Sequence, residues 1–256
     1  MNELYINQVL LPSHHTSHSP RPSPSHQHNS ASHPTLSITI ALKLYRHPQS
    51  ICTKRVQTVL EEKKLQYEFI VVDFLKGEHL SEPYGAEFHP FKKIPVLVDE
   101  ESNVKVFESR AIAHYIAAKY RDSGPDLNPS EADIKAYASF QQGLSIELSY
   151  FDANVGVIAW EAIFKPMLGY GAGDEAAIKA KLAALDTALA GYEHILSRQS
   201  YLAGDEITLA DIFHLPYGSL VEQAGFGELL PKYPSVQAWW KRLRERESWK
   251  KVNASE

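Results

Sequence analysis

Residues 121–130, RDSGPDLNPS, separate two parts of the chain that differ in the spacing of their apolar residues. Before this segment, short apolar runs alternate with a helical pattern, whereas helical spacing alone persists after it. A turn-rich segment at such a change of pattern is typical of a linker. The sequence therefore predicts an α/β domain over residues 38–121, a linker over 122–130 and an all-helical domain over 131–256.

The first predicted domain contains a strand–helix–strand unit that is followed by two strands and a helix. The helix of the unit places Val56, Val59 and Leu60 on one face, and the two later strands are close enough in sequence to form a hairpin. Strands are expected at 37–45, 67–73, 95–100 and 104–108, and helices at 52–64 and 109–120. This order predicts a small mixed sheet of thioredoxin type.

The composition limits the partners that the chain can bind. A net charge of −5 and a pI of about 6.2 provide no basic surface for a nucleic-acid backbone. No apolar run approaches the about 18 residues that span a bilayer, and no signal peptide is recognisable. The single cysteine excludes an intrachain disulfide and a cysteine-rich metal site. We expect a cytoplasmic protein that binds neither nucleic acid nor membranes.

The N-terminal residues 1–37 are predicted to be a disordered tail rich in His, Ser and Pro. Half of the chain's twelve histidines lie within residues 12–35, which contain almost nothing that could form a core. The histidines have no fixed spacing, so a solvated tail is favoured over a metal site, although both interpretations stay open.

The stretch HPQSICTKRV, residues 47–56, lies between a predicted strand and a predicted helix and carries a hydroxyl and a thiol. Ser50 could cap the helix or act in catalysis, because a hydroxyl at a helix N-terminus lies among unpaired N–H groups. Cys52 could be a nucleophile or a small buried residue of the first turn. The pattern alone does not decide between these roles.

Pro95 stands at the start of a predicted strand, where its missing N–H costs no hydrogen bond of the sheet. The peptide bond between Ile94 and Pro95 could be cis or trans. Only about one X-Pro bond in twenty is cis, so this choice depends on the wider context.

Five blocks of the sequence together supply that context. In order, they are HPQSICTKRV, KGEHLSEPY, HPFKKIPVLVD, FESRAIAHYIAAKY and YLAGDEITLADI. Their order and spacing over residues 41–252 resemble a glutathione transferase, closest to the phi class. The resemblance implies a thioredoxin-like domain that binds glutathione and an all-helical domain that receives an electrophile. It also implies a homodimer, glutathione as co-substrate with no further cofactor, and a cis bond before Pro95.

The resemblance assigns the catalytic role to Ser50. Its hydroxyl would stabilise the glutathione thiolate, because a free thiol with a pKa of about 8.5 is only slightly ionised at neutral pH. Lowering that pKa by two units corresponds to about 2.7 kcal/mol of preferential thiolate binding. The expected reaction is addition of glutathione to alkyl and aryl electrophiles, with glutathione peroxidase as a side activity.

The resemblance also assigns residues to each end of glutathione. Glu108 and Ser109 match the positions that hold the γ-glutamyl end, and the backbone of Ile94 is expected to pair with the cysteinyl part beside Pro95. The expected ligands of the glycyl end are His79 and Lys93. The family usually has a lysine after this histidine, and here Leu80 takes its place.

The expected electrophile pocket contains Ile51, Trp160 and Phe164. The two aromatic residues are four apart and share a helix face, a spacing that is also common in a hydrophobic core. Phe91 is a candidate anchor of the dimer, and Arg110 a structural or dimer-contact cation. Thr208 to Asp211 form an expected capping box that serves folding.

Two other functions compete with the transferase. Cys52 could serve a thiol-disulfide or isomerase enzyme, and a protein of this fold could carry ligands or bind a partner without catalysis. Fungal nitrogen-regulation proteins of this fold also have an added N-terminal segment, but theirs is rich in Asn and Gln. Turnover of a chlorinated aromatic with glutathione distinguishes these possibilities.

Overall fold

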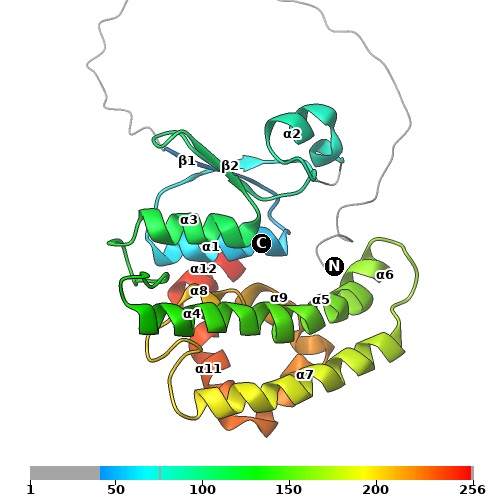
Figure 1. Ribbon diagram of the computed structural model, residues 1–256. Helices are drawn as coiled ribbons and strands as arrows, with labels where there is room; N and C mark the ends of the chain where they lie inside the picture. Colours follow the sequence, from blue (N-terminus) through cyan, green and yellow to red (C-terminus); the bar gives the residue numbers. More distant parts are fainter. Residues whose placement is uncertain (1–40, 75, 255–256) are drawn as a thin grey trace, which may run out of the picture.

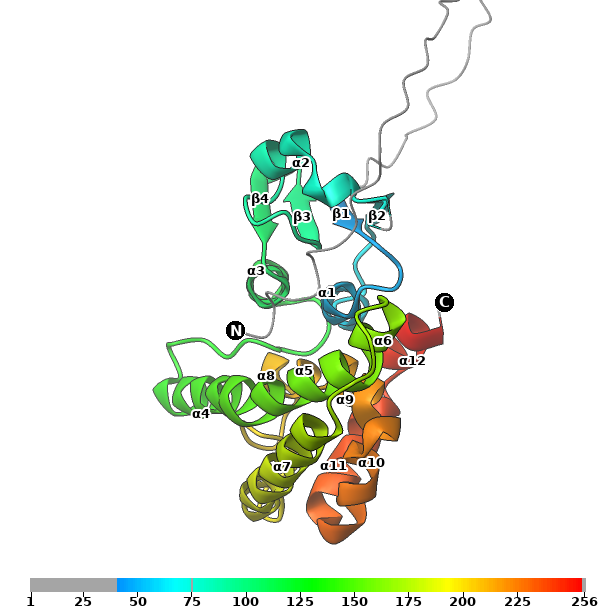
Figure 2. The ribbon, with the colours of Figure 1, turned by 90° about the vertical axis from the view of Figure 1, so that its right-hand side faces the viewer.

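The computed structural model describes residues 41–74 and 76–254, so the predicted tail lies outside the described residues. Figure 1 shows a small sheet at one end of the molecule and a larger group of helices at the other. Helices α1 (Ile51–Glu62) and α3 (Ser109–Lys119) form a layer between them. The view in Figure 2 shows the same layering from the side.

The sheet has the strand order β2-β1-β3-β4. Strands β1 (Leu42–Arg46) and β2 (Glu68–Val71) run parallel and are joined through α1, as predicted for the strand–helix–strand unit. Strands β3 (Val96–Asp99) and β4 (Val104–Phe107) pair as an antiparallel hairpin. The thioredoxin-like fold of this domain is therefore confirmed.

Burial explains why α1 sits against the sheet. Val56, Val59 and Leu60, the predicted apolar face, are fully buried. They join a continuous core with Leu44 of β1 and Leu97 of β3. Full burial of such side chains stabilises the fold by about 1.5–3 kcal/mol each, so this face fixes the orientation of α1.

A short helix, α2 (Glu82–Glu87), lies in a stretch where the sequence indicated only a polar, broken segment. Six residues are too few to produce a periodic pattern. A capping signal is present, because the Ser81 hydroxyl accepts a hydrogen bond from the Tyr84 N–H over 3.3 Å. The 3₁₀ turn Glu78–Leu80 precedes this cap.

The second domain contains helices and connecting loops but no strand among its described residues, as predicted, and its first long helix is not uniform. π-helical segments at Glu147–Asp152 and Trp160–Phe164 interrupt it and divide it into three parts. Those parts are α4 (Ile134–Ile146), α5 (Ala153–Ala159) and α6 (Lys165–Met167). π segments often occur at functional sites, and the second one leads directly into the pocket described below.

The helices that follow α7 (Glu175–Leu196) are α8 (Leu209–Ile212), α9 (Leu215–Val221), α10 (Phe226–Leu229), α11 (Pro234–Arg244) and α12 (Glu247–Ala254). Among them, α11 packs on α7, whereas α8, α9 and α12 pack on α1. The predicted capping box is confirmed, because the Asp211 carboxylate accepts the Thr208 N–H over 3.0 Å. The same carboxylate accepts Trp239 Nε1–H, which ties the box to the core.

Buried charges join the two domains. Arg110 of α3 donates to the Glu147 carboxylate over 2.8 Å and lies 3.0 Å from Asp152. Burial raises the pKa of Glu147, and the positive charges of Arg110 and Arg55 oppose that rise. Arg110 is thus a structural cation at the domain boundary, in line with the sequence-based expectation.

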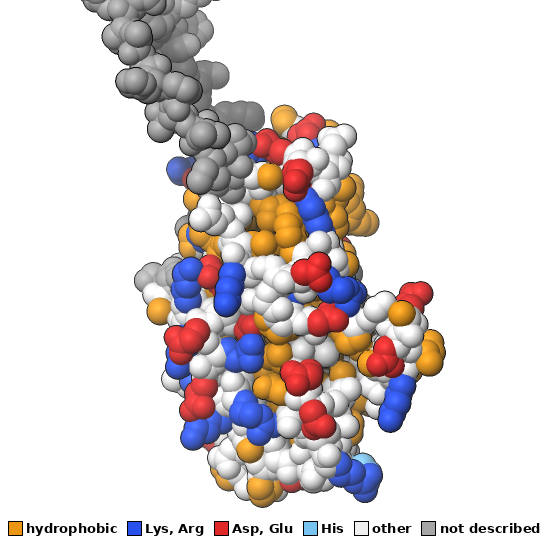
Figure 3. Space-filling view, turned by 90° about the vertical axis from the view of Figure 1, so that its left-hand side faces the viewer, with side chains coloured by type: hydrophobic (Ala, Val, Ile, Leu, Met, Phe, Trp, Pro, Cys, Tyr) orange, Lys and Arg blue, Asp and Glu red, His pale blue; other side chains and the backbone are white. Residues whose placement is uncertain are grey.

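Figure 3 shows positive and negative side chains interspersed over one face, with no continuous basic area on that face. Within residues 41–74 and 76–254, no helix is both long and apolar enough to cross a bilayer. The same residues contain no cluster of three or more His, Cys, Asp or Glu side chains arranged to hold a metal ion.

Candidate active site

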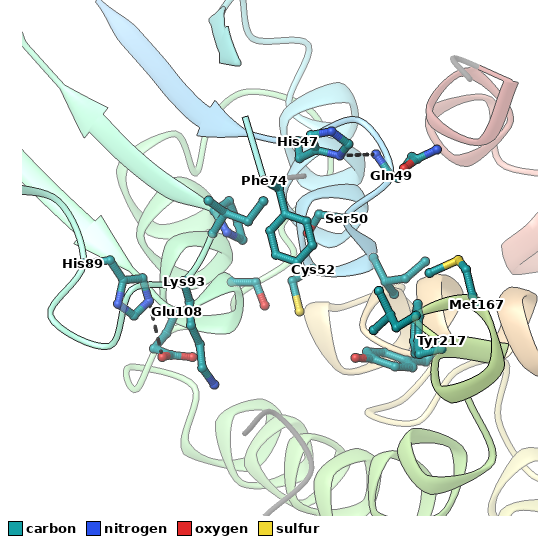
Figure 4. Close-up of a pocket in the computed structure, with 16 residues that line it drawn as sticks. His47, Gln49, Ser50, Cys52, Phe74, His89, Lys93, Glu108, Met167 and Tyr217 are labelled. Atoms are coloured by element: carbon teal, nitrogen blue, oxygen red, sulfur yellow. Dashed lines mark hydrogen bonds and ion pairs between the residues drawn. The ribbon is translucent and has the colours of Figure 1, made fainter. Parts of the chain in front are cut away.

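A pocket lies between the two domains, and Figure 4 shows the side chains that line it. The thioredoxin-like domain provides a mostly polar wall from the ends of its strands and helices. The helical domain provides the opposite wall with Phe164, Met167, Leu168 and Tyr217. A reactant bound here would contact both domains at once.

Ser50 lies in this pocket and also caps α1. The chain leaves β1, turns through residues 47–49 and places Ser50 in an extended conformation ahead of the helix. The Ser50 Oγ accepts a hydrogen bond from the Thr53 N–H over 3.3 Å. Because the oxygen acts as the acceptor, its O–H can still donate toward a sulfur in the pocket. The capping and catalytic roles are therefore compatible.

Cys52 also lines the pocket and is half-buried. Of the two roles left open for Cys52, that of a fully buried residue of the first turn is not observed. The turn of α1 brings Arg55 Nη1 to 3.9 Å from the Cys52 Sγ. A nearby cation generally favours the thiolate form of a cysteine, so Cys52 stays a candidate nucleophile.

Ile94 and Pro95 lie on the pocket wall, and the bond between them is cis, as the family resemblance implied. Lys93 lines the pocket beside them. The Tyr84 hydroxyl of α2 donates to the Lys93 carbonyl over 2.8 Å. The short helix α2 thus helps to hold the loop that presents these three residues.

Glu108 and Ser109 line the pocket where β4 ends and α3 begins. Glu108 has a φ of 70°, a conformation that L-residues rarely adopt and that concentrates at functional sites. Its carboxylate lies 3.8 Å from His89 Nε2. The Ser109 hydroxyl accepts a hydrogen bond from Arg55 Nη1 over 2.7 Å. This junction places an acidic group and a helix N-terminus side by side.

The structure does not bring His79 to the pocket wall. Its ring stacks on Phe74 with centroids 4.4 Å apart, and only 2% of the residue is exposed. Neither ring nitrogen has a hydrogen-bond partner among the described residues, and burial lowers the pKa of His79. Phe74 lines the pocket in its place. In this geometry, His79 therefore does not place a charged imidazole in direct contact with a glycyl carboxylate.

Of the predicted electrophile residues, Ile51 and Phe164 line the pocket and Trp160 does not. The Trp160 ring packs against Tyr170, with centroids 5.9 Å apart, on the segment that follows α6. Helical spacing correctly placed the two aromatic residues on one helix. It could not show that a later part of the chain would cover one of them.

Sequence reasoning missed several lining residues. His47 and Gln49 flank Ser50 in the same turn, so their position was a usable signal. Phe74, His89 and Tyr217 gave no comparable signal, because only the folded chain brings them to the pocket.

Met167 and Leu168 sit on a segment whose two ends are held by Glu161. The Glu161 carboxylate contacts Lys165 Nζ over 2.7 Å and accepts the Asp174 N–H over 2.8 Å. The backbone also approaches closely here, since a Cβ on Gly173 would lie 2.1 Å from the Glu161 carbonyl oxygen. Glu161 thus clamps the segment that forms the apolar wall.

Comparison with known proteins places this geometry in a family. Residues 40–118 match the glutathione S-transferase N-terminal domain, and residues 153–247 match the C-terminal domain. Glutathione S-transferase PM239X14 of Arabidopsis thaliana is 45% identical over 78% of this chain and 90% of its own length. Glutathione S-transferase hmp2 of Hypomyces subiculosus is 41% identical over 84% and 99%, respectively.

Solved structures agree with these sequence matches. Glutathione transferase F7 of Populus trichocarpa has a TM-score of 0.77 and 37% identity, covering 83% of this chain and 97% of its own. Maize glutathione S-transferase I, solved with an atrazine glutathione conjugate, has a TM-score of 0.75 and 32% identity, covering 84% and 100%. The chain belongs to the glutathione S-transferase family, among relatives of the phi class.

Proposed function

We propose that this enzyme joins the thiol of glutathione to apolar electrophiles and that the Ser50 hydroxyl stabilises the thiolate. The observation that carries this proposal is the position of Ser50, which caps α1 and lines the pocket between the domains. The helix N-terminus adds partial positive charge and N–H groups beside the sulfur. A peroxidase side activity would use the same thiolate.

Glutathione would lie along the polar wall. Its γ-glutamyl end would be held by Glu108 and Ser109, where the helix N-terminus favours the α-carboxylate. Its cysteinyl part would pair with the backbone of Ile94 beside Pro95 in the manner of an added strand. Lys93 would bind the glycyl carboxylate, and His79 would act indirectly by supporting the Phe74 ring.

The electrophile would occupy the wall formed by the helical domain. Phe164, Met167 and Leu168 line this side of the pocket with apolar side chains, and Ile51 of α1 adds a further apolar side chain from the other domain. Such a wall suits an aromatic or alkyl group, in keeping with the atrazine conjugate bound by the maize relative. Trp160 would act only by supporting Tyr170.

We also propose a cytoplasmic homodimer. Phe91 is 69% exposed on the loop ahead of β3, which is unusual for a large apolar side chain and fits an interface anchor. The proposed domain limits are 38–121 for glutathione binding, 122–130 for the linker and 131–256 for the electrophile. The family matches at 40–118 and 153–247 are compatible with these limits.

The test compares three serine or cysteine variants with wild type in a transferase assay with a chlorinated aromatic. Ser50→Ala should reduce turnover at least ten-fold, somewhat less than the roughly hundred-fold or greater cost of losing one donor to a developing charge. Ser81→Ala is the matched control, because it removes a capping hydroxyl with the same 3.3 Å geometry from α2, outside the pocket. Loss of activity in both serine variants would indicate a folding effect and contradict the proposal.

The same assay examines the thiol-disulfide alternative, which the pocket position of Cys52 favours. Cys52→Ser should leave conjugation nearly unchanged if Ser50 activates the sulfur. If Cys52→Ser abolishes activity while Ser50→Ala does not, the redox function replaces the transferase. A wild-type protein that binds glutathione without turning over any electrophile would instead support a carrier.

A further inference from the structure

His89 lines the pocket wall next to a residue that is proposed to bind the γ-glutamyl end of glutathione. It lies on the loop between α2 and β3, and only 1% of it is exposed. Its Nε2 atom is 3.8 Å from the Glu108 carboxylate. Figure 4 shows the imidazole and this carboxylate facing each other, joined by a dashed line. The buried ring is thus directed at a side chain that a ligand would contact.

The fold fixes the orientation of this imidazole. Its Nδ1 atom accepts a hydrogen bond from the Phe91 N–H over 3.2 Å. A neutral ring that accepts at Nδ1 carries its proton on Nε2. The ring also packs on Phe107, with centroids 4.6 Å apart, and Phe107 directly precedes Glu108 in the chain. The Nε2–H group is therefore presented to the carboxylate before any ligand binds.

The Glu108 side chain can benefit from such a restraint, because it is 41% exposed. Fixing an exposed, flexible side chain in one geometry costs conformational entropy when a ligand binds, and preorganisation lowers that cost. At 3.8 Å the contact is longer than a direct hydrogen bond, so it orients the carboxylate by electrostatic attraction. Both carboxylate oxygens keep the capacity to accept hydrogen bonds from an ammonium group.

We propose that His89 is a positioning residue that holds the Glu108 carboxylate toward the γ-glutamyl ammonium of glutathione. This inference rests on the proposed function, in which Glu108 binds that end of the tripeptide. Its consequence is selectivity for thiols that carry a positive charge at this end. The ammonium is remote from the sulfur and is bound equally before and during bond formation. His89 therefore affects the KM for glutathione and leaves kcat nearly unchanged.

The experiment separates the roles of the two ring nitrogens. In His89→Asn, the side-chain oxygen can still accept from the Phe91 N–H, but no donor reaches Glu108. In His89→Gln, the side-chain amide can take the place of the Nε2–H group, whereas the acceptor for Phe91 is lost. A role confined to the loop therefore predicts the larger defect in His89→Gln, and positioning of Glu108 predicts it in His89→Asn.

Both variants are assayed in the full chain with a saturating chlorinated aromatic and two thiols. The thiols are glutathione and deaminoglutathione, the same tripeptide without its ammonium group. Wild type should prefer glutathione, and His89→Asn should reduce this ratio of kcat/KM values by roughly three- to five-fold, the scale of a partly exposed ion pair. The kcat with glutathione should stay within about two-fold, because the lost contact does not change during the reaction. His89→Gln should keep the wild-type ratio.

Two further variants complete the test. In a Glu108→Gln background, His89→Asn should have little additional effect on the ratio, because the two residues act through one contact. His114→Asn is the matched control, since His114 also has a partner at Nδ1 and an aromatic neighbour but does not line the pocket. It should keep the wild-type ratio.

An unchanged ratio in His89→Asn, or equal reductions in both His89 variants, would overturn the role of His89 and leave the proposed placement of glutathione standing. A wild type without any preference for glutathione would contradict that placement itself, and this inference with it.

Discussion

The buried guanidinium of Arg55 donates a hydrogen bond from Nη1 to the Ser109 hydroxyl over 2.7 Å. Arg55 belongs to α1, which Ser50 caps, and Ser109 is the first residue of α3. One side chain thus links the proposed thiol-activating end of the site to the proposed γ-glutamyl end. Asp152 of the helical domain lies 3.9 Å from the same guanidinium.

Arg55→Lys should weaken glutathione binding. A lysine presents a point charge and cannot reproduce the planar fork that faces Ser109 and Asp152 together. Losing one hydrogen bond from a charged group costs about 1.5–3 kcal/mol, so we expect the KM for glutathione to rise about ten-fold or more. Steady-state titration of glutathione measures this effect. Arg246→Lys, at an arginine–carboxylate pair with Glu62 outside the pocket, should leave the KM unchanged.

Glu161 should control the electrophile and not glutathione. Glu161→Ala removes the contacts to Lys165 and to the Asp174 N–H, which releases the segment that carries Met167 and Leu168. We expect the KM for a bulky aromatic electrophile to change by about two- to five-fold, the scale of a loss of up to about 1 kcal/mol.

A matched control is available for the Glu161 clamp. Glu245→Ala breaks a contact of the same i,i+4 spacing with Lys241, remote from the pocket, and should have no kinetic effect. A parallel change in the KM for glutathione in Glu161→Ala would show that the segment shapes the whole site, contrary to the expectation.

His214 should make the folded state less stable in acid. Its Nδ1 contacts the Ala210 carbonyl over 2.8 Å and its Nε2 contacts the Tyr192 hydroxyl over 2.9 Å, a set of partners that suits a neutral ring. Burial lowers the pKa of His214 from 6.5 to about 3. Protons therefore bind the unfolded chain first, and stability is lost as the pH falls below about 6.5.

The expected loss at pH 5 is about 2 kcal/mol, from about 1.5 pH units at 1.36 kcal/mol per unit. Urea unfolding of wild type and His214→Asn between pH 5 and 7 measures it, and the variant should show the smaller dependence. Only the difference reports His214, because burial also lowers the pKa values of His79 and His114. An NMR titration in which the His214 ring of the folded wild type protonates near pH 6 would refute the argument.

Phe91 should be required for assembly. Replacing this exposed ring with Asp would put a charge into the proposed apolar contact, where an unpaired charge is costly. Sedimentation at micromolar concentration should change from a dimer of the 28.8 kDa chain to a monomer. Phe69→Ser, on the exposed edge strand β2, is the control and should stay dimeric. A wild type that sediments as a monomer would rule out the dimer itself.

Most of the fold could be predicted from the sequence, because its helices and strands follow from local patterns of apolar residues. Three buried residues of α1 recur with helical spacing, and the two strands of the hairpin are short, β-branched segments that lie close together in sequence. The interruptions by π-helical segments were invisible, since they leave the apolar spacing of a long helix almost unaltered. Helix α2 was missed because its six residues are too few to show helical periodicity, and its cap alone did not predict a helix.

The site was predictable where one turn or one junction contains it. Ser50, Pro95 and Ser109 each precede or open an element, so their places on the pocket wall depend on local chain geometry. His79 lies in an equally suggestive loop, but the ring of Phe74 separates it from the pocket. Tyr217 reaches the pocket only because α9 docks on α1, a long-range contact that no short motif encodes.

The walls of the pocket belong to different domains, and this has a consequence for the lifetime of the protein. A ligand that touches both walls binds only while the two domains are in contact, so its binding adds to the free energy needed to separate them. At a hundred times its Kd, such a ligand contributes about 2.7 kcal/mol. When the supply of the ligand falls, the docked state loses that contribution and exposes itself more often to proteolysis. We therefore expect the abundance of this protein to follow the concentration of the compound that it consumes.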